Sequence, residues 1–198
     1  MTRMPKTEPH TLNPEGQPDE ALPSVARTIV LVGLMGAGKT TVGRRLARRL
    51  GLEFADSDFE IEKAAQMTVG DIFSSYGEDY FRDGERRVIS RLMDGPPRVL
   101  ATGGGAFINE ETRSLMKDKS ITIWLDASLD VLLERTSRRD TRPLLKDGDP
   151  KTILKRLLAE RGPLYAQADI KIQSSDGPHD TVVNSIIQTL EDKGLARA

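Results

Sequence analysis

The sequence predicts an α/β fold, a three-layer sandwich in which helices cover both faces of a central parallel sheet of about five strands. From Thr28 onward, short apolar runs alternate with stretches of helical periodicity, a pattern typical of parallel sheets with crossover helices. The chain has 198 residues, of which 37% are hydrophobic and 30% charged. This length and composition fit a single globular domain with a buried core.

The predicted strands are short runs rich in β-branched residues. The run from Ile29 to Val32 is apolar on both faces, as expected of a strand buried in the middle of a sheet, and the run from Ile121 to Leu125 has the same character. Three further strands are expected over residues 53–55, 99–101 and 170–173.

The predicted helices lie between these strands. Val42, Leu46 and Leu50 recur every four residues, and Gly51 is a suitable residue to end that helix. Further helices are expected over residues 58–66, 69–76, 78–93, 110–117, 129–136, 151–160 and 182–190.

Two segments lack this periodicity. Residues 1–24 hold five of the 11 prolines and few periodic apolar residues, so they are interpreted as a flexible tail preceding a domain over residues 25–198. This segment has no apolar stretch of the kind found in a secretory signal. The segment Ser137 to Pro150 is charged and interrupted by Pro, Gly and Asp, so it is expected to be a loop.

Charge and composition exclude several classes of protein. Lys and Arg total 29 against 30 Asp and Glu, which leaves no broad basic surface for nucleic acid or an anionic membrane. No apolar run approaches the roughly 18 residues of a membrane-spanning helix. The absence of cysteine excludes disulfides, thiolate metal sites and cysteine nucleophiles. We therefore expect a cytoplasmic monomer that binds neither nucleic acid nor membranes.

The strongest motif is GLMGAGKT, from Gly33 to Thr40, between the first strand and the first helix. It fits the phosphate-loop pattern G-x-x-x-x-G-K-[ST] in its usual strand–loop–helix context. Backbone amides of such a loop surround the phosphates of a nucleotide, the lysine reaches the β- and γ-phosphates, and the hydroxyl of the following residue binds Mg²⁺. The ATP-binding residues expected here are Gly36, Ala37, Gly38, Lys39, Thr40 and Thr41.

Two carboxylates follow the second predicted strand. Asp56 and Asp58 lie on one side of an extended segment at the edge of the sheet where ligands bind. One could hold Mg²⁺ while the other accepts a hydrogen bond from a substrate hydroxyl, although Asp58 could equally cap the following helix. Asp126 resembles a Walker-B aspartate, but a place before the next helix is favoured because Asp56 already fills the metal role.

A third strand ends in three successive glycines, Gly103 to Gly105. Glycines at this edge allow a ligand to approach the backbone closely, although a flexible turn is the alternative. Arg82 stands in a helical stretch and Arg161 near the end of another predicted helix; taken singly, each is interpreted as a surface arginine.

Taken together, GLMGAGKT, DSD, FRDGE, ATGGG, RPLL and RGPLY resemble, in order and spacing, the motifs of shikimate kinases, and the resemblance covers about residues 28–190. It implies a P-loop kinase that uses ATP to phosphorylate the 3-hydroxyl of shikimate, giving shikimate 3-phosphate and ADP in chorismate and aromatic amino-acid biosynthesis. It also implies substrate-binding helices over about residues 58–94 and a lid over 137–150.

The resemblance assigns residues to four groups. Catalysis falls to Lys39, Asp58 and Arg142, the last as the lid arginine, and Mg²⁺ to Thr40 and Asp56. Arg142 also contacts ATP, and Arg135 lies near adenine; a second adenine contact, around residues 173–177, stays unassigned. The shikimate contacts are Asp58, Arg82, Gly103, Gly104, Gly105 and Arg161.

Two other functions are compatible with parts of this pattern. A small kinase of the same architecture could act on gluconate or a nucleoside monophosphate, since gluconate also combines a carboxylate with hydroxyls. A nucleotide-gated regulatory switch would instead need an exposed apolar docking surface, whereas the predicted lid is charged. The combination of Arg82, the triple glycine and Arg161 favours shikimate.

Overall fold

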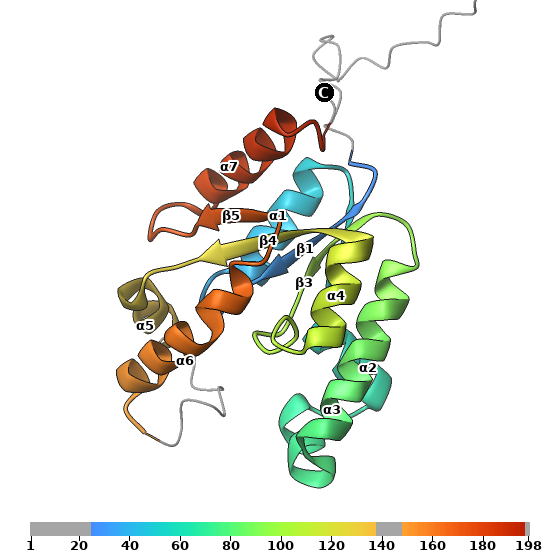
Figure 1. The fold of residues 1–198 in the computed structure, drawn as a ribbon, viewed down its shortest axis with the longest axis vertical. Helices are drawn as coiled ribbons and strands as arrows, with labels where there is room; N and C mark the ends of the chain where they lie inside the picture. Colours follow the sequence, from blue (N-terminus) through green and yellow to red (C-terminus); the bar gives the residue numbers. More distant parts are fainter. Residues whose placement is uncertain (1–24, 138–147, 197–198) are drawn as a thin grey trace, which may run out of the picture.

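A computed structural model describes residues 25–137 and 148–196. Five parallel strands form one sheet in the order β2-β3-β1-β4-β5 (Figure 1), which confirms the predicted fold class. The strands are β1 Thr28–Val32, β2 Glu53–Asp56, β3 Arg98–Ala101, β4 Ser120–Asp126 and β5 Ile170–Gln173.

The centre of the sheet is its most buried part. Every residue of β1 is buried, since β1 lies between β3 and β4 and both of its faces are covered. Leu31 is paired with Ala101 and with Ile123, so the carboxyl ends of these strands lie at one edge. In an open parallel sheet this edge is where a ligand crevice forms.

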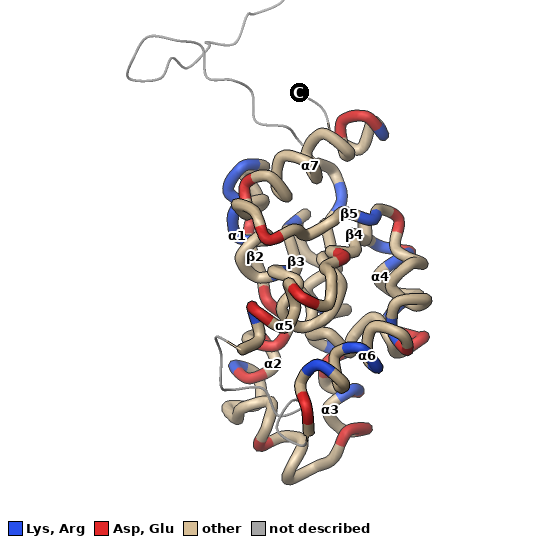
Figure 2. The backbone as a smooth tube through the Cα atoms, turned by 90° about the vertical axis from the view of Figure 1, so that its left-hand side faces the viewer, with Lys and Arg blue, Asp and Glu red and all other residues tan. Residues whose placement is uncertain are grey.

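Helices cover both faces of the sheet. The helices are α1 Lys39–Arg49, α2 Ser57–Ala65, α3 Val69–Met93, α4 Glu110–Lys119, α5 Leu129–Ser137, α6 Pro150–Tyr165 and α7 His179–Asp192. Helices α1 and α7 pack against each other on one face, and α4 packs on the opposite face, against β4 and α3 (Figures 1 and 2). Helices α2 and α3 extend beyond the carboxyl edge of the sheet (Figure 1). Each helix among the described residues is too short or too polar to span a bilayer.

The break predicted between helices over residues 69–76 and 78–93 is confirmed, since Gly77 (φ 80°, ψ 177°) interrupts α3 with a non-helical backbone, whereas another helix extends beyond its predicted end. The structure extends α6 through Pro163 to Tyr165, because the buried Tyr165 anchors its last turn and the amide of Ala166 bonds back to Gly162. The predicted tail, residues 1–24, lies outside the described residues, as does most of the predicted lid.

Candidate active site

The phosphate loop connects β1 to α1 with the expected geometry. Gly36 and Gly38 have φ of 83° and 93°, values that favour glycine and allow the tight turns of the loop. The ammonium of Lys39 donates to the carbonyl oxygens of Gly33 at 2.7 Å and Leu34 at 2.9 Å, so this side chain lies along the loop. The first turn of α1 therefore presents the amides and the cation that phosphates require.

The two aspartates after β2 have different environments. Asp56 accepts a hydrogen bond from the hydroxyl of Thr40 at 2.8 Å, and its other oxygen accepts from the amide of Asp58 at 3.2 Å. Asp56 is thus the residue that caps α2, and the expectation that Asp58 might be the cap is wrong. The Asp58 side chain is left without a capping role.

Asp58 lies beside a second carboxylate. A Cβ atom built on Gly103 would lie 2.6 Å from Oδ1 of Asp58 and 3.2 Å from Oε1 of Glu85, so these two oxygens meet over one glycine. Burial raises the pKa of Asp58, and the charge of Asp56 raises it further, while Lys39 and Arg82 oppose the shift. The carboxylate of Asp58 is therefore a stronger base than an ordinary aspartate.

Arg82 is held in place from two sides. Its Nη1 donates to Glu85 at 2.7 Å, and its Nε and Nη2 donate to Glu78 at 3.3 and 3.2 Å. Burial disfavours its charge, but Glu85 and Glu78 outweigh that cost and raise the pKa of Arg82. The guanidinium therefore stays charged in a partly buried place.

Glu85 is the acidic residue that sequence reasoning missed. Its side chain is 1% exposed, and its Oε1 has no hydrogen-bond partner among the described residues. Burial raises the pKa of Glu85 against the opposing charge of Arg82. The spacing of three residues from Arg82 in a predicted helix was the available signal, because such pairs face each other.

The triple-glycine loop after β3 contacts α2, α3, α6 and the phosphate loop. The amide of Gly103 donates to Ser57 of α2 at 3.1 Å, and a Cβ on Gly105 would lie 2.7 Å from Nη1 of Arg82. A Cβ on Gly104 would lie 3.6 Å from the backbone of both Gly33 and Met35, which are part of the phosphate loop. The loop thus lies between the phosphate loop and the group formed by Asp58, Arg82 and Glu85.

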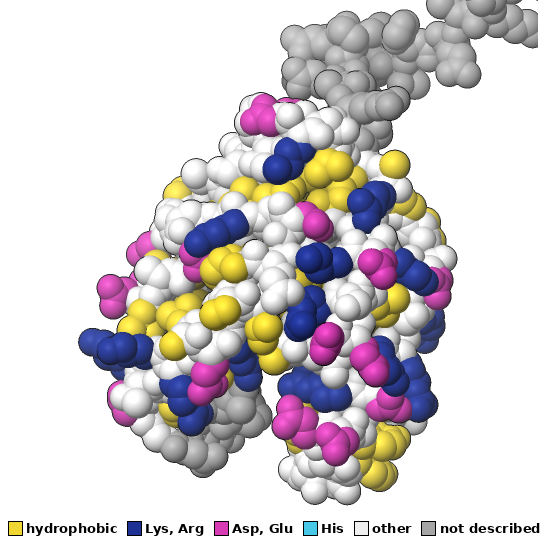
Figure 3. All heavy atoms as spheres, viewed as in Figure 1, with side chains coloured by type: hydrophobic (Ala, Val, Ile, Leu, Met, Phe, Trp, Pro, Cys, Tyr) yellow, Lys and Arg dark blue, Asp and Glu magenta, His cyan; other side chains and the backbone are white. Residues whose placement is uncertain are grey.

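Helix α6 reaches the same loop. The carbonyl oxygen of Gly104 accepts hydrogen bonds from Nη1 of Arg161 at 3.2 Å and from the hydroxyl of Tyr165. The half-buried Arg161 guanidinium is thereby brought to the loop that also contacts Asp58 and Arg82. Figure 3 shows the hollow between the α6 and α3 sides of the molecule.

The phosphate loop also contacts the segment after β5, through Arg135 and Ser174. Arg135 donates to the carbonyl of Gly36 at 3.4 Å, to the hydroxyl of Ser174 at 3.1 Å and to the carbonyl of Ser175 at 2.6 Å. Ser174 in turn donates to the carbonyl of Ala37 at 2.9 Å. The segment left unassigned from the sequence, residues 173–177, therefore lies against the phosphate loop.

Two other predicted groups fall elsewhere. Asp126 ends β4, and its carboxylate forms an ion pair with Lys171 of the neighbouring strand β5 at 3.0 Å. Arg142 lies outside the described residues. Among the described residues, no cluster of three or more His, Asp or Glu side chains is placed to hold a metal ion.

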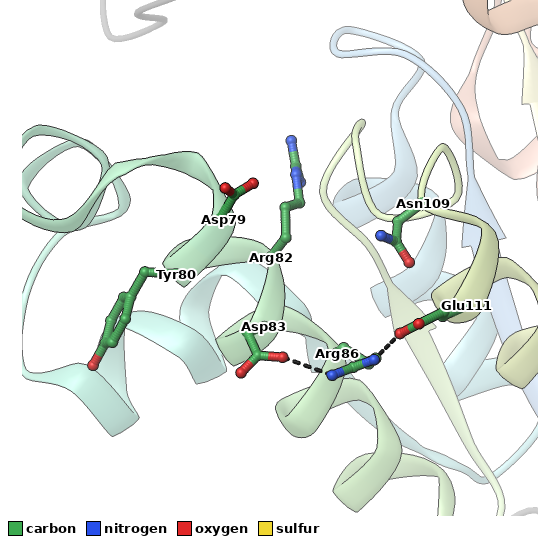
Figure 4. A pocket seen from close by; sticks show the side chains of 7 residues that line it. All are labelled: Asp79, Tyr80, Arg82, Asp83, Arg86, Asn109 and Glu111. Atoms are coloured by element: carbon green, nitrogen blue, oxygen red, sulfur yellow. Dashed lines mark hydrogen bonds and ion pairs between the residues drawn. The ribbon is translucent and has the colours of Figure 1, made fainter.

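A cavity of about 600 Å³ opens between α3 and the start of α4 (Figure 4). Arg86 lines this cavity and forms ion pairs with Asp83 at 2.6 Å and with Glu111. Arg82 extends out of this group (Figure 4), and its pairing with Glu85 links the cavity to the triple-glycine loop. The lining residues are Asp79, Tyr80, Arg82, Asp83, Arg86, Asn109 and Glu111.

Comparison with known proteins decides the family. The family model for shikimate kinase matches residues 35–191. The chain belongs to the shikimate kinase family. A shikimate kinase of Rhodopseudomonas palustris is 55% identical over 195 residues, which cover 97% of this chain and 96% of that relative. A match of this length extends into the first 24 residues, and their interpretation as a flexible tail stays a prediction.

Solved structures of the family have the same fold. A shikimate kinase from Acinetobacter baumannii in complex with shikimate has a TM-score of 0.80 and 41% identity, covering 88% of this chain and 96% of that one. The enzyme from Aquifex aeolicus has a TM-score of 0.72 and 37% identity, with coverages of 85% and 98%. A gluconokinase from Sinorhizobium meliloti shares the fold alone, at 18% identity, TM-score 0.57 and coverages of 85% and 94%.

Proposed function

We propose that this member of the shikimate kinase family transfers the γ-phosphoryl group of ATP to the 3-hydroxyl of shikimate, giving shikimate 3-phosphate and ADP, a step of chorismate and aromatic amino-acid biosynthesis. The observation that carries the proposal is the position of the triple-glycine loop. Gly104 adjoins the phosphate loop, while Gly103 and Gly105 adjoin Asp58 and Arg82. A phosphoryl donor and a hydroxyl acceptor bound on the two sides of this loop would meet at its edge.

On the acceptor side, the guanidinium groups of Arg82 and Arg161 bind the carboxylate of the substrate. Arg82 and Arg161 reach the glycine loop from different helices, and a planar guanidinium binds a carboxylate with two parallel hydrogen bonds. Asp58 accepts the proton of the substrate hydroxyl. Phosphoryl transfer passes through a loose transition state, so this proton moves late and correct positioning matters more than base strength.

On the donor side, the loop from Gly36 to Thr41 binds the phosphates of ATP. Lys39 turns from the carbonyls of Gly33 and Leu34 to the β- and γ-phosphates, where it offsets the charge that develops during transfer. Arg135, held against the phosphate loop by Gly36 and Ser174, lies beside the adenine.

Thr40 and Asp56 fit a Mg²⁺ site. Their oxygens are 2.8 Å apart, and Mg²⁺ in nucleotide sites takes few protein ligands, completing its shell with phosphate oxygens and water. When bound, Mg²⁺ supplies positive charge that neutralises the phosphates. The role of Asp56 is to hold a hydroxyl and a hydrated cation in register with the loop. Arg142, assigned from the family motif RPLL, is proposed as a further cation on the transferred group.

A coupled assay of ADP release tests this function. The protein is assayed with ATP and Mg²⁺ against shikimate, gluconate and nucleoside monophosphates, and Lys39→Ala serves as the control for contaminating kinases. Turnover with shikimate alone supports the proposal. A preference for gluconate or a nucleoside monophosphate refutes it, and turnover with none of them favours the nucleotide-gated switch.

A further inference from the structure

A buried tyrosine lies directly behind the acceptor site. Tyr165 ends α6 and is 1% exposed, and its ring packs near Phe107 and Trp124, with centroids 6.5 and 6.1 Å away. Its hydroxyl donates to the carbonyl oxygen of Gly104. Packing alone needs only the ring, since phenylalanine would fill the same space without burying a hydroxyl.

The same carbonyl oxygen is also bonded to Arg161. Nη1 of Arg161 lies 3.2 Å from the oxygen of Gly104, so the Tyr165 hydroxyl and the Arg161 guanidinium meet at one acceptor. A carbonyl oxygen has two lone pairs, and here both have donors.

The hydroxyl of Tyr165 can act as a hydrogen-bond donor at every pH at which the enzyme works. Burial raises the pKa of Tyr165 to about 12, although the charges of Arg161 and Arg82 oppose the shift. The phenol therefore keeps its proton throughout the range in which a kinase works, and the bond to Gly104 does not change with pH in that range.

We propose that Tyr165 is a positioning residue for the substrate: its hydroxyl fixes the Gly104 carbonyl and the Arg161 guanidinium, and so sets the direction in which Arg161 meets the substrate carboxylate. The inference rests on the proposed function, which gives Arg161 that carboxylate. Arg161 has five N–H donors, and one bond to Gly104 leaves a pair of donors for a ligand. Without the hydroxyl, the Gly104 carbonyl loses one of its two donors, and the Arg161 guanidinium bonded to it samples several orientations.

Tyr165→Phe removes the hydroxyl and keeps the ring. We expect the KM for shikimate to rise about fivefold, the effect of one buried hydrogen bond, while the KM for ATP stays within about twofold. Ser185→Ala is the matched control, since it also removes a hydroxyl that donates to a backbone carbonyl, that of Thr181, but at an exposed position of α7; it should leave both constants unchanged. Thermal unfolding of each variant verifies that the chain is folded. Equal changes in both KM values would mean a general loosening of the fold and would overturn the inference.

A double-mutant cycle with Arg161→Ala tests the route of the effect. If Tyr165 acts through Arg161, adding Tyr165→Phe to Arg161→Ala should leave shikimate binding unchanged. Calorimetric titration with shikimate supplies the dissociation constants where turnover is too slow to measure. Independent, multiplying effects would overturn the inference alone. If Arg161→Ala by itself leaves shikimate binding intact, the assignment of Arg161 in the proposed function fails first, and the inference with it.

Discussion

Gly103→Ala tests whether Asp58 is placed at the reacting hydroxyl. Gly103 does not have a positive φ, so the backbone accepts alanine there. The new Cβ would lie 2.6 Å from Oδ1 of Asp58 and 3.2 Å from Oε1 of Glu85, and contacts under 3.0 Å are essentially never observed. Because Glu85 is buried and bonded to Arg82, the Asp58 carboxylate is the group that moves.

The size of the effect follows from that displacement. Ordinary contact begins at 3.4 Å, so the oxygen of Asp58 must shift by roughly 0.8 Å. A misplacement of about 1 Å in a reacting group costs about 10²-fold in rate, or about 2.7 kcal/mol of transition-state stabilisation. Gly103 does not approach the phosphate loop as Gly104 does, so nucleotide binding should be retained.

The assay is steady-state kinetics with each substrate varied in turn. We expect kcat/KM for shikimate to fall about 10²-fold in Gly103→Ala, while the KM for ATP changes by no more than about twofold. Gly84→Ala is the matched control, since a Cβ at Gly84 meets nothing within 4 Å and alanine favours the interior of α3. A Gly103→Ala enzyme within about threefold of wild type would show that Asp58 does not accept the proton of the substrate hydroxyl.

Four further variants, with Arg138→Ala as a comparison, separate the remaining roles. Lys39→Ala should lower turnover about 10²–10³-fold in a folded protein, because its contact strengthens in the transition state; a decrease of under about threefold would contradict this. Asp56→Asn should raise the Mg²⁺ concentration needed for half-maximal rate, whereas Asp58→Asn should weaken shikimate binding and turnover while nucleotide binding is retained. Titration calorimetry with nucleotide and with shikimate distinguishes the two variants. If Asp56→Asn weakened shikimate binding and Asp58→Asn raised the Mg²⁺ requirement, the two assignments would be reversed. Arg142→Ala should lower kcat at least about tenfold with little change in shikimate affinity. Arg138, another arginine of the predicted lid, serves as the comparison: equal, small effects of Arg142→Ala and Arg138→Ala on kcat would exclude a specific role for Arg142.

The fold could be predicted because its elements are specified locally. The run Ile29 to Val32 has no polar face, so it fits a strand covered on both sides, and each of its residues is fully buried. The phosphate loop is specified in the same way, since its glycines adopt the positive φ values that the turn requires. Helix ends were less predictable: α6 continues past Pro163 because tertiary contacts of Tyr165 outweigh the local cost of proline.

The site could be predicted in its residues but not in their division of labour. Asp56 and Asp58 look equivalent in the sequence, and the contact of Thr40 with Asp56 is what separates them. Glu85 and Tyr165 stand at the ends of the motifs FRDGE and RGPLY, but neither motif shows by itself which group the side chain contacts. The bond of Tyr165 joins residues 61 positions apart, and local periodicity contains no information about which carbonyl a phenol will reach.

The sequence left two explanations for the triple glycine, a flexible turn or close approach of a ligand, and the structure distinguishes between them. None of Gly103, Gly104 and Gly105 has a positive φ, so the alternative of a flexible turn does not account for them. Two of them are glycines because space is lacking: a Cβ on Gly103 would meet the Asp58 carboxylate, and one on Gly105 would meet the Arg82 guanidinium. Gly104 has more room, and its carbonyl instead accepts from α6. Small size at two positions and a shared carbonyl at the third bring an acid and two arginines to a loop that also adjoins the phosphate loop, which is the arrangement that phosphorylation of a hydroxy acid requires.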